Sequence, residues 1–188
     1  MRLTHITASL ALIFAASPAL AEPTAEYPSL VGEFLKGCSE GELTAAAREA
    51  ALASNGWTKG DVSIDPKSLN ISGAIDKNFD FAKPLTISQW SKTIDGKAMT
   101  ALVATYPEKR RYPAICVMIA PDVQYGWTYS DALKAGMKGL GIKAKSTDLP
   151  HYFEYASKLP DGRPVRAELF GRSQALGRQK AMHLYIAF

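Results

Sequence analysis

The sequence predicts one α+β domain, with an antiparallel sheet of about five strands, two N-terminal helices and one helix between β-hairpins. Three observations lead to this fold class. Helix-forming segments come early, apolar runs of strand length follow them, and short polar turn sequences separate those runs. Residues 22–188, 167 in number, are enough to bury one hydrophobic core.

The chain begins with a segment typical of an export signal. Arg2 gives it a positive start, residues 8–16 form an apolar run, and an Ala-x-Ala sequence ends at Ala21. The apolar run is too short to span a bilayer, and Pro18 follows it closely. We therefore expect residues 1–21 to be a signal peptide; the alternative is a buried N-terminal helix.

Cleavage before Glu22 would leave residues 22–188 as a single domain in the periplasm or outside the cell. A lipid anchor is not expected, because Glu22 rather than a cysteine follows the cut. No second apolar run in the sequence approaches membrane-spanning length.

Two helices are expected soon after the leader. Ser29 can cap a short helix that ends at Gly37. Ser39 and Glu42 have the spacing of a capping box, and the Ala-rich run behind them predicts a stronger helix over residues 39–54.

The second helix is expected to end at Gly56, where Trp57 can fold back in a Schellman-type stop. Several turn signals interrupt residues 58–85. We expect this stretch to be mostly loop, with a strand near Leu85–Trp90.

Two apolar runs, 98–106 and 114–120, carry the clearest strand signal. Both alternating sets of residues in 98–106 are apolar, which indicates a central strand that is covered on both faces. The polar segment 107–113 joins the two runs, so we expect a hairpin with a long basic tip.

A third helix is expected after a loop over residues 121–127. Thr128 or Ser130 can cap it. Its apolar face would carry residues at helical spacing, namely Leu133, Met137 and Leu140.

The end of the chain is typical of a β-meander. Strands are expected over 151–158 and 164–170, on either side of a Pro-Asp-Gly turn at 160–162. A polar, basic connection over 171–180 leads to a closing strand over 181–188.

The chain has two cysteines, Cys38 and Cys116. In an oxidising compartment an even count predicts a disulfide, which would join the helical pair to the strand 114–120. The alternative is two buried free thiols. A catalytic thiol is not expected, because the sequence has no Cys-x-x-Cys motif and Cys116 lies in an apolar run.

The net charge of +4 hides an uneven distribution. Residues 131–188 carry ten basic and five acidic side chains, whereas residues 22–95 carry seven basic and eleven acidic ones. We hypothesise a basic patch that contacts an anionic envelope component such as lipid or glycan; the alternative is ordinary solvated faces. Nucleic acid is not an expected partner of an exported protein. The candidate residues of the basic patch are Lys109, Arg110, Arg111, Arg172, Arg178 and Lys180.

A second candidate site is aromatic and could stack on a ligand, although such residues also plug hydrophobic cores. Its residues alternate around the end of the expected loop: Tyr125, Trp127 and Tyr129. The later hairpin, 151–170, carries Glu154 and Arg166 at equal parity about the turn. They could form an acid/base pair in a cleft or a surface ion pair.

No residue pattern predicts catalysis, a metal or a cofactor. His151 and His183 are 32 positions apart and lack the close spacing of zinc ligands, so structural roles are expected. Ser173 follows Gly171 and Arg172, but the second glycine of a nucleophile elbow is missing.

The chain resembles small exported, periplasmic proteins of proteobacteria that have no assigned function. The resemblance rests on the export signal, the helix 38–57 with its terminal Gly-Trp, and the strand that bears Cys116. It implies no catalytic residues.

The leading hypothesis is a non-catalytic binding or accessory module of the envelope that acts through the basic patch. The alternative is a small periplasmic hydrolase or ligand-binding domain. That alternative would use the aromatic residues 125–129 and the hairpin 151–170.

Overall fold

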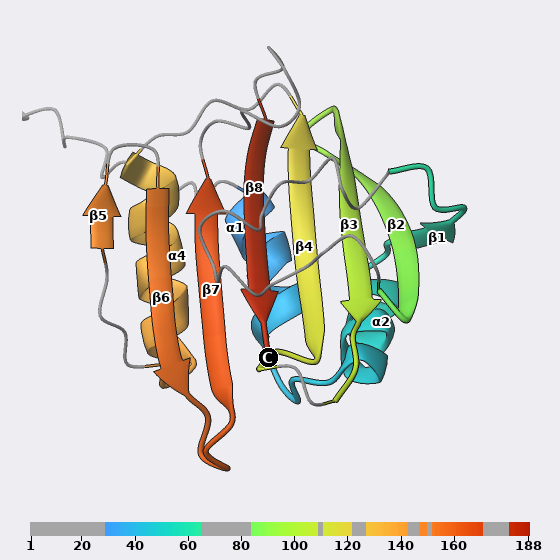
Figure 1. The fold of residues 1–188 in the computed structure, drawn as a ribbon. Coiled ribbons are helices and arrows are strands. Elements are labelled where there is room, and N and C mark those ends of the chain that lie inside the picture. The colour runs from blue at the N-terminus through green and yellow to red at the C-terminus, as the bar shows by residue number, and fades with distance from the viewer. Residues whose placement is uncertain are drawn as a thin grey trace, which may run out of the picture.

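A computed structural model describes most of the chain as one α+β domain (Figure 1). A single antiparallel sheet carries its helices on one face, two near the start of the described chain and one from between strands. The predicted fold class is therefore confirmed. The described residues are 29–64, 84–108, 111–121, 127–142, 147–149, 152–170 and 181–188.

The sheet has eight strands in the order β1-β2-β3-β4-β8-β7-β6-β5, and every neighbouring pair is antiparallel. The last strand of the chain, β8, lies in the middle of the sheet between β4 and β7 (Figure 1). The strands are β1 (Thr58–Gly60), β2 (Thr86–Ile94), β3 (Lys97–Thr105), β4 (Ala114–Pro121), β5 (Thr147–Leu149), β6 (Tyr152–Lys158), β7 (Pro164–Phe170) and β8 (Ala181–Ala187).

The expectation of about five strands was too low because both edge strands are very short. β1 and β5 have three residues each, which is too few to show an alternating pattern in the sequence. β1 pairs with β2 and β5 pairs with β6, so each exists through its longer neighbour.

β2 is longer than the strand expected near Leu85–Trp90, and it continues to a tight turn before β3. Asp95 and Gly96 both have positive φ, 52° and 74°, between the paired residues Ile94 and Lys97. This two-residue Asp-Gly loop has the backbone of a type I′ turn, whose twist matches that of the flanking strands.

The central strands are buried on both faces, as the apolar run 98–106 predicted. On β4, Cys116 and Met118 belong to a helix-side cluster, whereas Val117 and Ile119 belong to a cluster on the opposite face. All seven residues from Ala114 to Ala120 are buried. The helix-side cluster also contains Val31, Phe34, Leu52, Leu133 and Leu184.

The first helical segment is longer than expected, and the second begins later. α1 (Ser29–Phe34) runs directly into a wider turn, η1 (Leu35–Ser39), which passes the expected stop at Gly37. α2 (Ala45–Ser54) starts six residues after Ser39, so the predicted helix start was wrong. The cap is Thr44, whose Oγ1 accepts a hydrogen bond from the Ala47 N–H at 3.2 Å.

The chain between η1 and α2 cannot be helical. Glu40 is extended, with φ −77° and ψ 139°, and Gly41 has φ 82°, a left-handed conformation that favours glycine. The capping-box spacing of Ser39 and Glu42 was therefore coincidental.

The end of α2 confirms the predicted Schellman stop. The Trp57 N–H donates to the Leu52 carbonyl and the Gly56 N–H donates to the Ala53 carbonyl, both at 3.1 Å. Gly56 has the positive φ, 77°, that this motif requires. Trp57 is buried in the helix-side cluster.

The third helix, α4 (Trp127–Gly139), begins before both expected caps, so Thr128 and Ser130 lie within it. Leu133 and Met137 are buried, as their spacing predicted. Figure 1 shows α4 behind β6 and β7, while α1 lies behind β8 and β4. None of the helices described here is long and apolar enough to cross a membrane.

The predicted disulfide is present. Cys38 in η1 bonds to Cys116 in β4, with a Cα–Cα distance of 5.5 Å and a sequence separation of 78. The bond fixes the helical segments at the N-terminal end to a central strand of the sheet.

Candidate binding pocket

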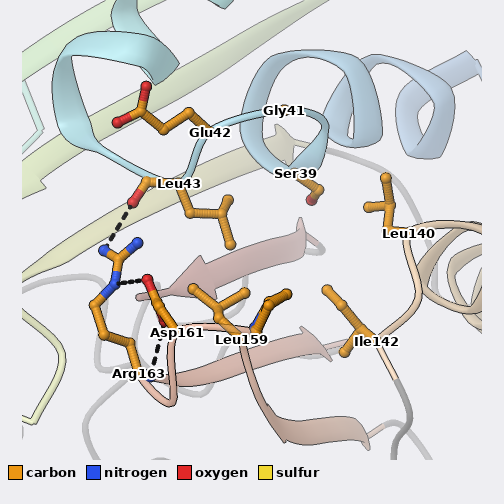
Figure 2. A pocket seen from close by; sticks show the side chains of 10 residues that line it. Ser39, Gly41, Glu42, Leu43, Leu140, Ile142, Leu159, Asp161 and Arg163 are labelled. Atoms are coloured by element: carbon orange, nitrogen blue, oxygen red, sulfur yellow. Dashed lines mark hydrogen bonds and ion pairs between the residues drawn. The ribbon is translucent and has the colours of Figure 1, made fainter.

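Three segments that are far apart in the sequence surround one pocket (Figure 2). They are the link between η1 and α2, the end of α4, and the turn between β6 and β7. The cavity has a volume of about 390 Å³. Its lining residues are Ser39, Gly41, Glu42, Leu43, Leu140, Ile142, Leu159, Pro160, Asp161 and Arg163.

Aliphatic side chains form most of the pocket wall. Leu43 is buried, and Leu140, Ile142 and Leu159 are partly buried and pack against the helix-side cluster. Figure 2 shows these side chains directed toward one another from the three segments. The pocket is therefore an apolar recess beside the core rather than a charged cleft.

The Pro-Asp-Gly turn positions one side of the pocket. The Leu159 N–H donates to the Arg163 carbonyl at 2.8 Å, and the Gly162 N–H donates to the Leu159 carbonyl at 2.9 Å. Gly162 has φ 86°, as its predicted role in the turn requires. These bonds hold Leu159 and Pro160 at the closed end of the hairpin.

An ion pair lies at the rim of the pocket. Arg163 Nε lies 2.6 Å from Asp161 Oδ2, and the Arg163 N–H donates to Asp161 Oδ1 at 2.9 Å. Hydrogen bonds from the Arg163 backbone and side chain lower the pKa of Asp161. Arg163 Nη1 also reaches the Leu43 carbonyl at 3.4 Å, a long hydrogen bond between the turn and the η1–α2 link.

Ser39 brings a buried hydroxyl to the pocket. The residue is 4% exposed, and Oγ has no hydrogen-bond partner among the residues that the structure describes. Figure 2 shows the hydroxyl directed toward the aliphatic lining. An unsatisfied buried hydroxyl costs about 1–3 kcal/mol, so a polar atom entering the pocket would recover free energy there.

Arg48 supports the η1–α2 link through a hydrogen bond. Its guanidinium is buried, at 2% exposure, and Nη2 donates to the Glu42 carbonyl at 2.8 Å. Burial lowers the pKa of Arg48, while the charges of Glu40 and Glu42 act to raise it. Arg48 thus holds the strand-like backbone that carries Gly41 and Leu43.

The polar side chains that line the pocket, among the described residues, are Ser39, Glu42, Asp161 and Arg163. Within the described ranges, Ser39 has no base in hydrogen-bonding contact, and Asp161 is bonded to Arg163. No group of three or more His, Cys, Asp or Glu residues that could hold a metal ion occurs in the described part of the chain. The arrangement can bind a ligand by shape, apolar contact and a few hydrogen bonds.

The basic patch lies almost entirely outside the described residues. Arg111 is the described member; it is exposed, with its guanidinium carbon 5.4 Å from the centre of the Tyr112 ring. The other five, which lie outside the description, are Lys109, Arg110, Arg172, Arg178 and Lys180.

The aromatic candidate site is not the loop that the sequence suggested. Trp127 and Tyr129 lie in the first turn of α4, and Tyr125 lies outside the described residues. Tyr129 is partly buried and packs against the helix-side cluster. Burial raises the pKa of Tyr129, and the charge of Asp95 adds to this effect. Tyr129 therefore belongs to the core packing, which was the alternative reading of these aromatics.

Glu154 and Arg166 are not directly opposed. The register of β6 and β7 pairs Glu154 with Glu168, and Arg166 with Ala156. The proposed cross-strand pair is thus offset by two positions along the hairpin.

His183, the histidine that the structure describes, is not among the residues that line the pocket. His151 lies outside the described residues, and His183 lies on β8 opposite Ile119 of β4. His183 is 3% exposed, and burial lowers its pKa to about 4. Its Nε2 has no hydrogen-bond partner in the part of the molecule that the structure covers.

The pocket was not predicted from the sequence, but one of the segments that line it was. The turn over residues 159–163 was predicted as a turn, and its signal was the Pro-Asp-Gly sequence. No local pattern relates that turn to Ser39 or to Ile142, because their proximity depends on tertiary packing.

Comparison with models of known families, with curated proteins and with solved structures finds no match. The pocket therefore has to be interpreted from its own chemistry.

Proposed function

We propose that this protein is a non-catalytic binding module of the cell envelope, and that it holds a small, mainly apolar group in the pocket. The observation that carries the proposal is a cavity of about 390 Å³ lined mainly by aliphatic side chains, with a buried hydroxyl at Ser39. Apolar pockets with a few convergent polar groups are the usual form of small-ligand sites.

Two further observations support this function over catalysis in the envelope. The polar groups of the pocket are held in structural contacts or lack a reactive neighbour within the described residues. The Cys38–Cys116 disulfide supports an oxidising compartment, which agrees with the export signal expected over residues 1–21. A protein that resides in the envelope and binds a ligand in this pocket would act as a binding or accessory module.

Binding can be tested with toluene, a neutral apolar probe, followed through the methyl NMR signals of the protein expressed without residues 1–21. We expect a saturable shift of the Leu43, Ile142 and Leu159 methyl signals. The variant Ile142→Trp should fill the recess and abolish the shift. The matched control is Leu85→Trp, which places the same side chain at an apolar position that is 67% exposed and outside the pocket lining.

Two results would contradict the binding function. One is the absence of a saturable shift in the wild-type protein. The other is an equal loss of the shift in Ile142→Trp and Leu85→Trp, which would show an effect unrelated to the pocket.

The exposed Arg111 favours a second mode of binding, through the basic patch. We propose that Lys109, Arg110 and Arg111 contact anionic lipid or glycan, with Arg172, Arg178 and Lys180. Binding to anionic vesicles should be strong at low salt and weak at high salt, because salt screens exposed charges. An absence of binding at low ionic strength would reject this mode.

A further inference from the structure

The geometry of the pocket points to a specific class of ligand, and this inference rests on the binding function proposed above. We propose that the pocket selects a short aliphatic molecule that carries a neutral hydrogen-bonding group, such as an alcohol or an amide. The neutral group would reach Ser39, and the aliphatic part would lie among Leu43, Ile142 and Leu159.

The first step of the argument is the unsatisfied hydroxyl. Ser39 Oγ is buried, lines the pocket and has no partner among the described residues. A hydroxyl can both donate and accept, so an alcohol or an amide can bond to it. A purely apolar ligand would leave the Ser39 hydroxyl without a partner, and an alcohol or amide of similar size would not.

The second step concerns charge. Among the lining residues that the structure describes, the cation is Arg163, whose Nε lies 2.6 Å from Asp161 Oδ2 at the rim. Glu42 also lies in the lining, and Figure 2 shows its carboxylate directed away from the aliphatic side chains. With respect to the described residues, a carboxylate ligand at Ser39 would therefore be buried without an unpaired cation beside it, which is costly.

Arg48 is not among the residues that line the pocket. Its Nη2 donates to the Glu42 carbonyl in the η1–α2 link at 2.8 Å. Glu40 and Glu42 are close enough for their charges to act on Arg48. A ligand ammonium is disfavoured as well, because no carboxylate among the lining residues is directed at Ser39 in Figure 2.

The third step concerns size. A volume of about 390 Å³ lies near the lower end of the range for ligand pockets, about 300–1,000 Å³. This space fits one short chain or one branched aliphatic group. A lipid with two long acyl chains would not be enclosed.

The test compares four six-carbon probes that share a chain and differ in their polar end: 1-hexanol, hexanamide, hexanoate and hexylamine. Each is titrated at pH 7 into the wild-type protein, with the methyl signals of the pocket as the readout. We expect 1-hexanol and hexanamide to bind about 10-fold more tightly than either charged probe, the ratio that corresponds to a modest penalty for burying an unpaired ion.

The variant Ser39→Ala tests the contact itself. It should weaken the binding of 1-hexanol and hexanamide by about 2- to 10-fold, the range for one lost neutral hydrogen bond, and should leave toluene binding unchanged. The matched control is Ser54→Ala, at an exposed serine of α2 outside the pocket lining, which should change neither.

The outcomes separate this inference from the binding function. If toluene and all four probes fail to bind the wild-type protein, the pocket is not a ligand site and both proposals fall. If toluene binds but the alcohol and amide have no advantage over hexanoate, only the ligand class is wrong. The same holds if Ser39→Ala weakens toluene and 1-hexanol equally. The wild-type comparison decides the matter even if Ser39→Ala does not fold.

Discussion

Gly136 shows how one missing side chain permits a helix contact. A β-carbon at this position of α4 would come within 2.3 Å of Leu35 Cδ1 in η1. The contact is tighter than packed atoms allow, so Leu35 or the helix would have to move. The structure identifies Leu35 as the neighbour for which the missing side chain of Gly136 leaves room.

The variant Gly136→Ala should therefore lower the free energy of unfolding by about 1–3 kcal/mol through overpacking. The matched control is Gly139→Ala in the same helix, where a β-carbon would meet nothing within 4 Å. That control should be neutral or slightly stabilising, because alanine is the better helix former. Urea unfolding of both variants checks the difference, and equal stabilities would contradict it.

His183 makes the stability depend on pH. Burial lowers its pKa in the folded state from 6.5 to about 4, so between these values the unfolded chain binds a proton that the folded chain does not. The stabilisation from the neutral side chain is fully present above pH 6.5 and is lost as the pH falls toward 4. The loss should reach about 3 kcal/mol.

The test is the pH dependence of urea unfolding between pH 7 and 4 in the wild type and in His183→Gln. The variant lacks the titrating group, so its stability should fall less steeply over this range. Parallel curves would show that His183 does not cause the loss. The comparison uses slopes, which stay informative even if glutamine lowers the stability at every pH.

At the scale of elements, capping decided where α2 begins. The sequence offers two hydroxyl residues before the Ala-rich run, Ser39 and Thr44, and the structure uses Thr44. Tertiary contacts fix the segment before Thr44. Cys38 is bonded to Cys116, and Arg48 donates a hydrogen bond to the Glu42 carbonyl in the link that follows Ser39. A local pattern could not choose between the two caps.

Removing the true cap with Thr44→Ala should cost about 1 kcal/mol of stability, because the Ala47 N–H loses its acceptor. Thr44→Ser keeps a hydroxyl at the same position and should retain most of the stability. Thermal or urea unfolding measures both. A Thr44→Ser variant as unstable as Thr44→Ala would argue against the capping role.

Among the strands, the predictions were good wherever the apolar pattern was long. The hairpins 98–120 and 151–170 and the closing strand β8 were expected. The burial of β4 and β8 follows from their apolar runs in the sequence. The edge strand β1 was not predicted, because its three residues are exposed and contacts with other elements stabilise it. It pairs with β2, and Lys59 lies 3.1 Å from Glu49 of α2.

At the scale of the whole molecule, the disulfide joins two parts of the fold that do not adjoin in the sequence. It links the helical segments to the sheet across 78 positions. Closing a loop of that length stabilises the folded state by about 4 kcal/mol on the chain-entropy estimate.

The double variant Cys38→Ala/Cys116→Ala should lose about that amount of stability. Urea unfolding of the wild type with a reductant should approach the curve of the variant, and the reductant should not affect the variant itself. Unchanged stability on removing both cysteines would show that packing alone holds the helical segments.

The local features of this protein can be predicted from its sequence alone. It indicated the fold class, the strands buried on both faces, the Schellman stop at Gly56, the Pro-Asp-Gly turn and the Cys38–Cys116 pairing. Each depends on the preferences of a few neighbouring residues or on a count of cysteines, and such preferences are visible in a linear sequence.

The order of the strands and the existence of the pocket depend instead on tertiary packing. Placing β8 between β4 and β7 joins the two hairpins into one sheet, and the packing of the helices on that sheet brings Ser39, Ile142 and Leu159 together. Ser39 is more than a hundred positions from Ile142 and Leu159, and their proximity results from burying one shared apolar face. No local preference carries that information, which is why the candidate site emerged from the fold.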